Sequence, residues 1–205
     1  MLDCLQMKAL ANNKKAMRAA RDVLHYLAYG SNLHPYRLVQ RVPNARLVTT
    51  TRLDGHAVSF SKRSHDGSSK CNLATAASAD CAAYVAIYEI PLSEKHLLDA
   101  AEGLGEGYDQ TKFQVTVANV TFNVFTYIAA ATHVSDELPP YDWYKSMIVE
   151  GARYHAFPDE YVRGFELQSC IPDPDVGRRN KAVAIVSQMR RIKKGAPGGA
   201  PLQNV

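Results

Sequence analysis

The segment of the sequence most suggestive of chemistry is Tyr29-Gly30-Ser31-Asn32, which follows a short strand-like run at His25–Tyr29. A glycine placed between a strand and a helix lets several backbone N–H groups converge on one point. Such a turn favours an anion, either a substrate carboxylate or a developing oxyanion. The same residues also suit an ordinary turn, in which Gly30 supplies the dihedral angles and Asn32 caps the helix. On this tetrapeptide alone, the ordinary turn is the more common outcome.

Glu102 is the second candidate, because it follows an expected helix, Glu94–Ala101, which Ser93 would cap and Gly103 would stop. The helix dipole is negative at this end and disfavours an ionised carboxylate, which suits a carboxyl group that must exchange protons near neutral pH. An acid here departs from the usual preference for Lys or Arg, and such departures gather at functional sites. The alternative is an exposed surface acid, and propensity alone weighs the two equally.

Other reactive side chains have weaker support. Ser31 lacks the G-x-S-x-G setting of a nucleophilic serine. Tyr141 and Tyr144 could direct phenol groups into a cleft, although aromatic residues of this kind more often pack in a core. The seven histidines show no metal-binding pattern, and Asp66 and Lys70 are most simply surface charges.

Composition is typical of a soluble globular protein. The chain has 205 residues, which suits one domain with tails, and its hydrophobic (46%) and charged (21%) fractions are ordinary. No apolar run approaches the roughly 20 residues that cross a bilayer. The four cysteines are scattered without zinc spacing. Because the N-terminus also lacks a secretory signal, we expect reduced thiols and a cytoplasmic location.

The formal net charge of +4 conceals basic clusters at both ends of the chain. Clusters of this kind can bind nucleic acid or anionic lipid, but basic termini are more often solvated tails. No aromatic residue interleaves the C-terminal cluster. We therefore favour solvated tails and expect neither a nucleic-acid nor a membrane partner.

Hydrophobic periodicity predicts an α+β domain with an antiparallel, barrel-like sheet. The expected strands are His25–Tyr29, Arg46–Leu53, His56–Ser61, Leu73–Ala77, Ala82–Ile90 and a hairpin of Thr111–Val117 with Thr121–Ala129. The polar run Lys62–Lys70 is expected to be a turn. Besides Glu94–Ala101, the expected helices are Leu5–Leu24, Tyr141–His155, Pro158–Gln168 and a weaker basic helix at Arg178–Arg191.

Several short segments, in this order and spacing, resemble the γ-glutamylcyclotransferase family, particularly its bacterial members. The matching segments are Tyr29–Leu33, Lys62–Ser64, Asp66–Ser68, Lys70–Leu73, Ala101–Gly103, Gly107–Tyr108, Pro140–Lys145 and Gly151–Arg153. Each is weak alone, and their combination is specific. The resemblance divides the chain into an N-terminal helical extension (residues 1–24), a γ-glutamylcyclotransferase-like domain (25–170) and a basic, partly disordered C-terminal tail (171–205).

The resemblance implies a small mixed, barrel-like β-sheet flanked by helices and an activity without metal or cofactor. Family members convert γ-glutamyl amino acids or γ-glutamyl amines into 5-oxoproline and the free amine. By matching position, Glu102 is the implied catalytic acid/base. The implied substrate-binding residues are Tyr29, Gly30, Ser31, Asn32, Leu33, Tyr108 and Tyr144. The preferred leaving amine stays open, and the resemblance allows a homodimer.

This chemistry agrees with the residues, because the substrate's own α-amine is the nucleophile and the protein needs to supply neither Ser nor Cys. A protein of a different class is also compatible with the sequence: a catalytically inactive module that holds a small carboxylate in the same cleft. The presence of Glu102 favours the enzyme, since a binder of an anionic ligand gains nothing from a nearby acid.

Overall fold

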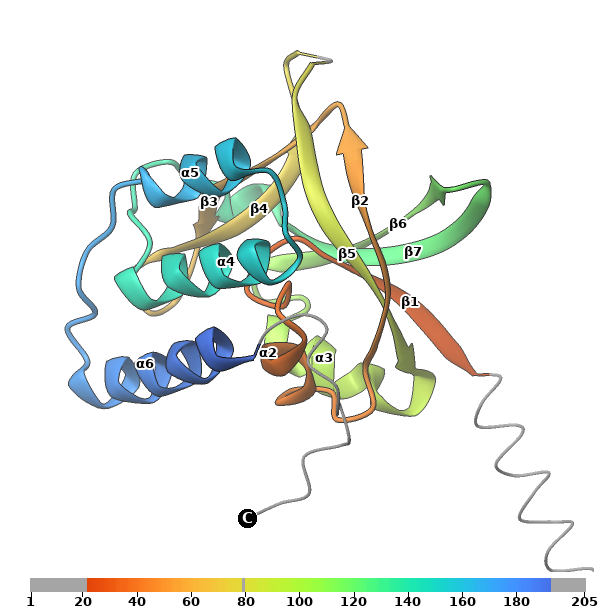
Figure 1. The fold of residues 1–205 in the computed structure, drawn as a ribbon. Coiled ribbons are helices and arrows are strands. Elements are labelled where there is room, and N and C mark those ends of the chain that lie inside the picture. Colours follow the sequence, from red (N-terminus) through yellow and green to blue (C-terminus); the bar gives the residue numbers. More distant parts are fainter. Residues whose placement is uncertain (1–21, 79, 193–205) are drawn as a thin grey trace, which may run out of the picture.

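The computed structural model describes residues 22–78 and 80–192 and is built around a five-stranded sheet with strand order β2-β5-β1-β7-β6 (Figure 1). Its strands are β1 (Val23–Ala28), β2 (Arg46–Asp54), β5 (Ala82–Pro91), β6 (Tyr108–Val117) and β7 (Val120–Ala129). β1 pairs in parallel with β7, and the other neighbours are antiparallel. The sheet is therefore mixed.

A second sheet consists of β3 (His56–Arg63) and β4 (Ser69–Thr75), paired in antiparallel fashion. Hydrogen bonds are among the contacts that connect it to the main sheet and to the segment that follows that sheet. The Asn72 side chain accepts a hydrogen bond from the backbone N–H of Ala129 at 2.9 Å, and Ser61 O accepts one from the N–H of Ser135 at 2.7 Å. Strand pairing extends into both ends of the expected Lys62–Lys70 turn, which shortens it to residues 64–68.

Helices flank the sheets on one side and below, so the α+β class predicted from the sequence is confirmed (Figure 1). They are α2 (Pro35–Val39), α3 (Lys95–Glu102), α4 (Asp142–Tyr154), α5 (Asp159–Glu166) and α6 (Val176–Arg191), with short 3₁₀ turns at Leu92–Glu94 and Ala131–His133. Figure 1 shows α4, α5 and α6 stacked beside the two sheets, with α2 and α3 beneath the main sheet.

Two of the expected helix caps are wrong. Ser93 lies within a 3₁₀ turn and does not cap α3. His34, and not Asn32, caps α2: its Nδ1 accepts the Tyr36 N–H at 3.1 Å, with Pro35 in the first turn as expected. Asn32 is thereby free to direct its side chain elsewhere.

The ends of the described region differ from the sequence expectation. Val23 and Leu24 belong to β1 and pair with Pro91 and Ile90 of β5, while the rest of the expected N-terminal helix lies outside the described residues. At the other end, α6 packs on α4 through a cluster of Met147, Ala182, Val186 and Met189. This part of the expected tail is thus an integral element, and residues 193–205 lie outside the described residues.

The turn between β6 and β7 consists of Ala118 and Asn119, whose φ angles of 47° and 68° are both left-handed. Two left-handed residues match the twist of a tight hairpin, which allows the expected hairpin to form despite its weak turn signal.

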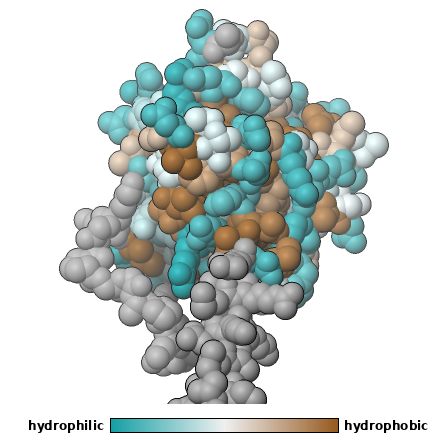
Figure 2. Space-filling view, turned by 90° about the vertical axis from the view of Figure 1, so that its right-hand side faces the viewer, coloured by the Kyte–Doolittle hydropathy of each residue, from teal (hydrophilic) through white to brown (hydrophobic). Residues whose placement is uncertain are grey.

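Figure 2 shows the face of the molecule on the right of Figure 1, where hydrophobic residues gather in small groups among hydrophilic ones. Within residues 22–78 and 80–192, no helix combines the length and apolar character needed to cross a membrane.

The approach of α4 to the turn after β1 depends on Gly151. A Cβ atom at this position would lie 2.7 Å from the Cβ of Leu33 and 3.2 Å from the N of His34, which is closer than real side chains pack. Leu33 is fully buried at this contact. The lack of a side chain at Gly151 therefore fixes how closely α4 supports the turn that follows β1.

We expect Gly151→Ala to lower the free energy of unfolding by about 1–3 kcal/mol, because the added methyl group must displace the backbone near Leu33. Gly164→Ala is the matched control. A Cβ there has open space within α5, so alanine should be neutral or slightly stabilising. Urea unfolding of the two variants checks this, and equal stabilities would contradict the role assigned to Gly151.

Candidate active site

A small pocket of about 20 Å³ lies where the ends of β1 and α3 meet β4, β6 and α4. Its lining residues are Tyr26, Tyr29, Gly30, Ser31, Asn32, Cys71, Glu102, Tyr108, Tyr127 and Tyr144. Leu33 alone among the site residues predicted from the sequence does not line it. That side chain is fully buried and packs under Gly151, so its contribution is to hold the turn in place.

The end of α3 brings Glu102 into the pocket. Gly103 adopts a left-handed conformation with φ 66°, and the N–H of Leu104 returns to the carbonyl of Asp99 at 3.0 Å. This is the glycine-terminated helix end that the sequence predicted. The Glu102 side chain is only 15% exposed, so the surface-acid interpretation is wrong.

The Glu102 carboxylate is held through one of its two oxygens. Oε1 accepts a hydrogen bond from Asn32 Nδ2 at 2.8 Å and another from the guanidinium of Arg41. Arg41 also donates to Asn32 Oδ1 at 2.9 Å, which closes a three-membered network. Within the described residues, Oε2 has no hydrogen-bond donor. The arrangement fixes the orientation of the carboxylate and leaves its second oxygen available to a ligand.

Arg41 was not predicted as a site residue. It lies just beyond the end of α2, distant from Glu102 in the sequence, and only the tertiary fold brings the two side chains together. Its positive charge counters the negative end of the α3 dipole beside Glu102, an effect that the expectation from the helix end alone omitted.

The turn after β1 leaves two backbone N–H groups without a protein acceptor among the described residues. The N–H of Leu33 donates to Gly30 O at 2.9 Å, whereas the N–H groups of Ser31 and Asn32 find no acceptor among the described residues. Gly30 does not have a positive φ, so the expected dihedral reason for a glycine is wrong. The reason is space, because a Cβ would lie 3.2 Å from the Cβ of Cys71.

Hydroxyl groups fix the tyrosine walls of the pocket. Tyr108 donates to Cys71 O at 2.6 Å, and Tyr144 accepts the Cys71 N–H at 3.0 Å. Tyr29 donates to the carbonyl of Tyr127. Burial raises the pKa of Tyr29, Tyr108 and Tyr144 well above the ordinary value, so these side chains stay neutral hydroxyls. The sequence did not decide whether Tyr144 faces a cleft or packs in the core. In the structure it lines the pocket.

Sequence reasoning also missed Tyr26, Tyr127 and Cys71 as lining residues. Tyr26 and Tyr127 lie within buried strands and read as core residues, although the Tyr26 hydroxyl accepts from Asn32 Nδ2 at 3.1 Å. Cys71 lies within the matching segment Lys70–Leu73, which was the available signal. Burial raises the pKa of the Cys71 thiol to about 12, so it stays protonated and is a poor nucleophile.

Asp66 and Lys70 are not the surface charges that the sequence suggested. Their carboxylate and ammonium groups lie 2.7 Å apart, with side chains 17% and 14% exposed. The Lys70 ammonium lies 4.8 Å from the centroid of the Tyr144 ring, so the pair supports one wall of the pocket. Burial acts to raise the pKa of Asp66, but the hydrogen bond and charge of Lys70 outweigh it, and the pKa lies below its ordinary value.

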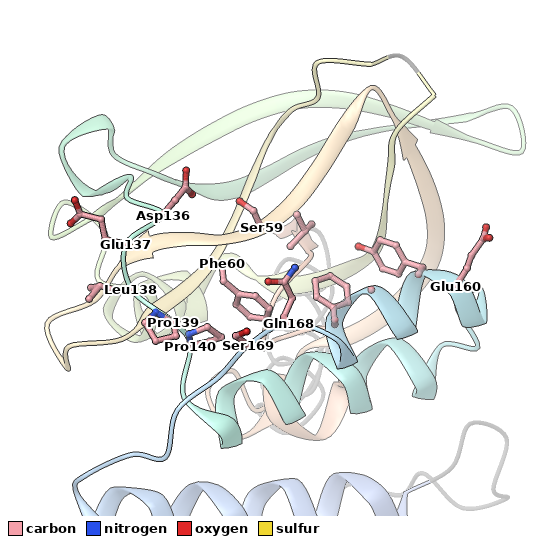
Figure 3. A pocket seen from close by; sticks show the side chains of 14 residues that line it. Ser59, Phe60, Asp136, Glu137, Leu138, Pro139, Pro140, Glu160, Gln168 and Ser169 are labelled. Carbon is pink, nitrogen blue, oxygen red and sulfur yellow. The ribbon is translucent and has the colours of Figure 1, made fainter.

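A larger, open cleft lies between β3, α5 and residues 136–140 (Figure 3). Its floor is aromatic, with Phe60 near its centre, and Figure 3 shows the carboxylates of Asp136 and Glu137 at its outer edge. The Phe60 ring meets the Tyr144 ring edge-on at 6.2 Å, which connects this cleft to the wall of the smaller pocket. The smaller pocket is the candidate active site because it combines a held carboxylate with unpaired backbone N–H groups.

In the described part of the chain, no three His, Cys, Asp or Glu side chains come together in a group that could hold a metal ion.

Known proteins share this fold. A sequence model of the AIG2-like family matches residues 82–165, which include Glu102, Tyr108 and Tyr144. A structure named gamma-glutamyl cyclotransferase is 21% identical, with a TM-score of 0.68 over 81% of this chain and 99% of that chain. An uncharacterized protein from Homo sapiens is likewise 21% identical, with a TM-score of 0.68 over 82% of this chain and 99% of that one.

YkqA from Bacillus subtilis is 18% identical, with a TM-score of 0.61 over 78% of this chain and 60% of that chain. No curated protein matches the sequence. At these identities the solved structures demonstrate a common fold, and the AIG2-like match adds a sequence relationship over the segment that carries Glu102.

We expect Asp66→Asn to lower the free energy of unfolding at pH 7 by about 1–3 kcal/mol, because it leaves the Lys70 ammonium buried without its partner. The folded-state pKa of Asp66 is lowered, so its contribution is fully present above the unfolded pKa of about 3.9 and is lost as the pH falls through the lower folded value. Urea unfolding of both proteins between pH 7 and pH 2.5 measures this. A stability difference that does not shrink below pH 4 would contradict the assignment.

Proposed function

The chain has the fold of gamma-glutamyl cyclotransferase, as the sequence resemblance predicted, and we propose that it catalyses the reaction of that name. It would convert a γ-glutamyl amino acid or γ-glutamyl amine into 5-oxoproline and the free amino acid or amine. The observation that carries the proposal is the Glu102 carboxylate, which is held through one oxygen beside a turn with two unpaired N–H groups. An acid/base and an oxyanion-binding turn are what such a cyclisation needs.

The substrate's α-amine has a pKa near 8 and is mostly protonated at pH 7, so it must lose a proton before it can attack. Glu102 accepts that proton through Oε2. The neutral amine then attacks the γ-carbonyl carbon, and the carbonyl oxygen becomes an oxyanion. When the bond from that carbon to the leaving nitrogen breaks, Glu102 returns a proton to the leaving amine. The ring nitrogen gives up its second proton, which the released amine carries as part of its ammonium group. The reaction consumes no water and needs no oxidant or reductant.

The N–H groups of Ser31 and Asn32 are the proposed donors to the oxyanion, since they have no acceptor among the described residues. Ring closure joins two parts of one molecule, so holding the amine against the carbonyl removes several kcal/mol of the barrier. In the proposal, the neutral hydroxyls and rings of Tyr29, Tyr108 and Tyr144 hold the glutamyl part and limit access of water to the carbonyl.

Arg41 and Asn32 are proposed as positioning residues. Both donate to Oε1 of Glu102, so the carboxylate cannot rotate freely and Oε2 faces a fixed direction. The proton acceptor is therefore prepared before the substrate binds.

The second candidate function is an inactive module that holds a small carboxylate. It explains the turn after β1 but leaves the held carboxylate of Glu102 without a purpose, because a negative charge repels an anionic ligand. We therefore place the enzyme first. A cytoplasmic location and a homodimer stay predictions from the sequence.

We expect Glu102→Gln to lower kcat for 5-oxoproline formation by about 10²–10⁴-fold, because an amide cannot accept the proton of the α-amine. Glu106→Gln is the matched control, since Glu106 is an exposed acid in the loop that follows α3. Product formation from γ-glutamyl-alanine, measured by chromatography, compares the two. Turnover of Glu102→Gln within threefold of the wild type would refute the proton-transfer role.

We expect Arg41→Gln to lower kcat for 5-oxoproline formation by about 10- to 100-fold, because the Glu102 carboxylate loses a donor to Oε1 and is freer to rotate away from the substrate. Arg41→Lys should restore part of the rate, and Arg52→Gln, at an exposed ion pair with Asp54, should leave it unchanged. A kcat of Arg41→Gln within threefold of the wild type would show that the arginine serves only the fold.

A further inference from the structure

The Lys62 side chain is a buried cation that the proposed reaction does not use. It lies on β3, is 5% exposed, and places its ammonium 4.7 Å from the centroid of the Tyr108 ring, a wall of the pocket. Among the described residues, no carboxylate lies within 4 Å of this ammonium and no side-chain hydrogen bond reaches it. The charges of Glu102 and Asp66 act on it only over a longer distance. A buried charge without a directly paired counter-charge is costly, and an anionic ligand is one way to supply that partner.

The chain makes room for this lysine at the edge of the pocket. Gly107 has a φ of 131°, and a Cβ there would lie 2.9 Å from Lys62 Nζ and 3.0 Å from the ring of His133. Gly107 belongs to the short loop that connects Glu102 to Tyr108. The ammonium thus lies against the segment between the proposed acid/base and a tyrosine of the wall, behind the residues that line the pocket.

The charges around the pocket do not cancel. Its charged neighbours are the cations Arg37, Arg41, Lys62 and Lys70 and the anions Asp66 and Glu102. Asp66 pairs with Lys70 and Glu102 pairs with Arg41, which leaves Lys62 and Arg37 without ion-pair partners among the described residues. Burial lowers the pKa of Arg37 to about 10 and that of Lys62 below its ordinary value, yet the arginine stays charged at neutral pH.

Two unpaired cations match a ligand that carries two carboxylates. A γ-glutamyl amino acid has one on the glutamyl α-carbon and a second on the leaving amino acid, whereas a γ-glutamyl amine has only the first. The glutamyl carboxylate is one carbon away from the amine that must reach Glu102. It therefore falls on the side of Arg41, which is directly paired with Glu102, and of Arg37 in the adjoining helix α2, whereas the interaction of Lys62 with Glu102 is only one of longer-range charge. Lys62 approaches from a different element, across Tyr108, and is left for the second carboxylate.

We propose that Lys62 binds the carboxylate of the leaving amino acid and thereby selects γ-glutamyl amino acids over γ-glutamyl amines. This inference rests on the proposed function. It makes Lys62 a specificity-determining residue, and it predicts that the substrate arrives from a reaction that joins the γ-carboxyl group of glutamate to the amine of an amino acid.

The test compares γ-glutamyl-alanine with γ-glutamyl-ethylamide, which differ only in the leaving-group carboxylate. For the wild type, we expect kcat/KM to be about 10- to 100-fold higher with the alanine compound, as a charge-assisted contact provides. Lys62→Met should lower kcat/KM for γ-glutamyl-alanine by a similar factor and change that for the ethylamide less than threefold. Lys112→Met, at an exposed lysine of β6, should alter neither value.

Each outcome is decisive. Equal kcat/KM values of the wild type for the two substrates would overturn the proposal, and so would an equal loss on both substrates in Lys62→Met, which would assign the lysine to the glutamyl half. If Lys62→Met does not fold, Lys62→Gln and product inhibition of the wild type replace it, with alanine expected to inhibit at least tenfold better than ethylamine. Absence of 5-oxoproline from both substrates would instead refute the proposed function itself.

Discussion

The site depends on one interaction, the network in which Asn32 and Arg41 hold a single oxygen of the Glu102 carboxylate. A carboxylate at the negative end of a helix is unfavourable on its own, and the guanidinium offsets that field. Because both donors act on Oε1, the other oxygen has a fixed direction and no protein partner within the described residues. Three elements, the turn after β1, the end of α2 and the end of α3, must meet for this to occur.

Close backbone packing brings these elements together. Gly151 lets α4 reach the Leu33 turn, Gly30 lets that turn lie against Cys71, and Gly107 lets the loop after α3 lie against Lys62. Each glycine lies where two segments that line or support the pocket come into contact. Any side chain at these positions would hold the two segments apart. Hydroxyl contacts from Tyr108 and Tyr144 to the backbone of Cys71 then fix the walls.

Local signals predicted the elements well and their partners poorly. The end of α3 at Gly103 and the class of the fold could be read from the sequence, because a left-handed glycine and hydrophobic periodicity act locally. The parallel pairing of β1 with β7 could not, since nothing local distinguishes it. Arg41 was missed for the same reason: it reaches Glu102 only through tertiary packing. Asn32 was expected to cap the helix that follows it. In the structure His34 caps α2, and the Asn32 side chain binds Glu102 instead.

The central claim is that the bound substrate undergoes intramolecular cyclisation, with Glu102 as the group that transfers the protons and without water as a reactant. Incubation of γ-glutamyl-alanine, labelled with ¹⁵N at the glutamyl amine, in ¹⁸O-enriched water tests it most directly. The account predicts 5-oxoproline with ¹⁵N in the ring and no ¹⁸O, together with unlabelled alanine. Free glutamate that carries ¹⁸O would show hydrolysis in place of cyclisation and would contradict the account.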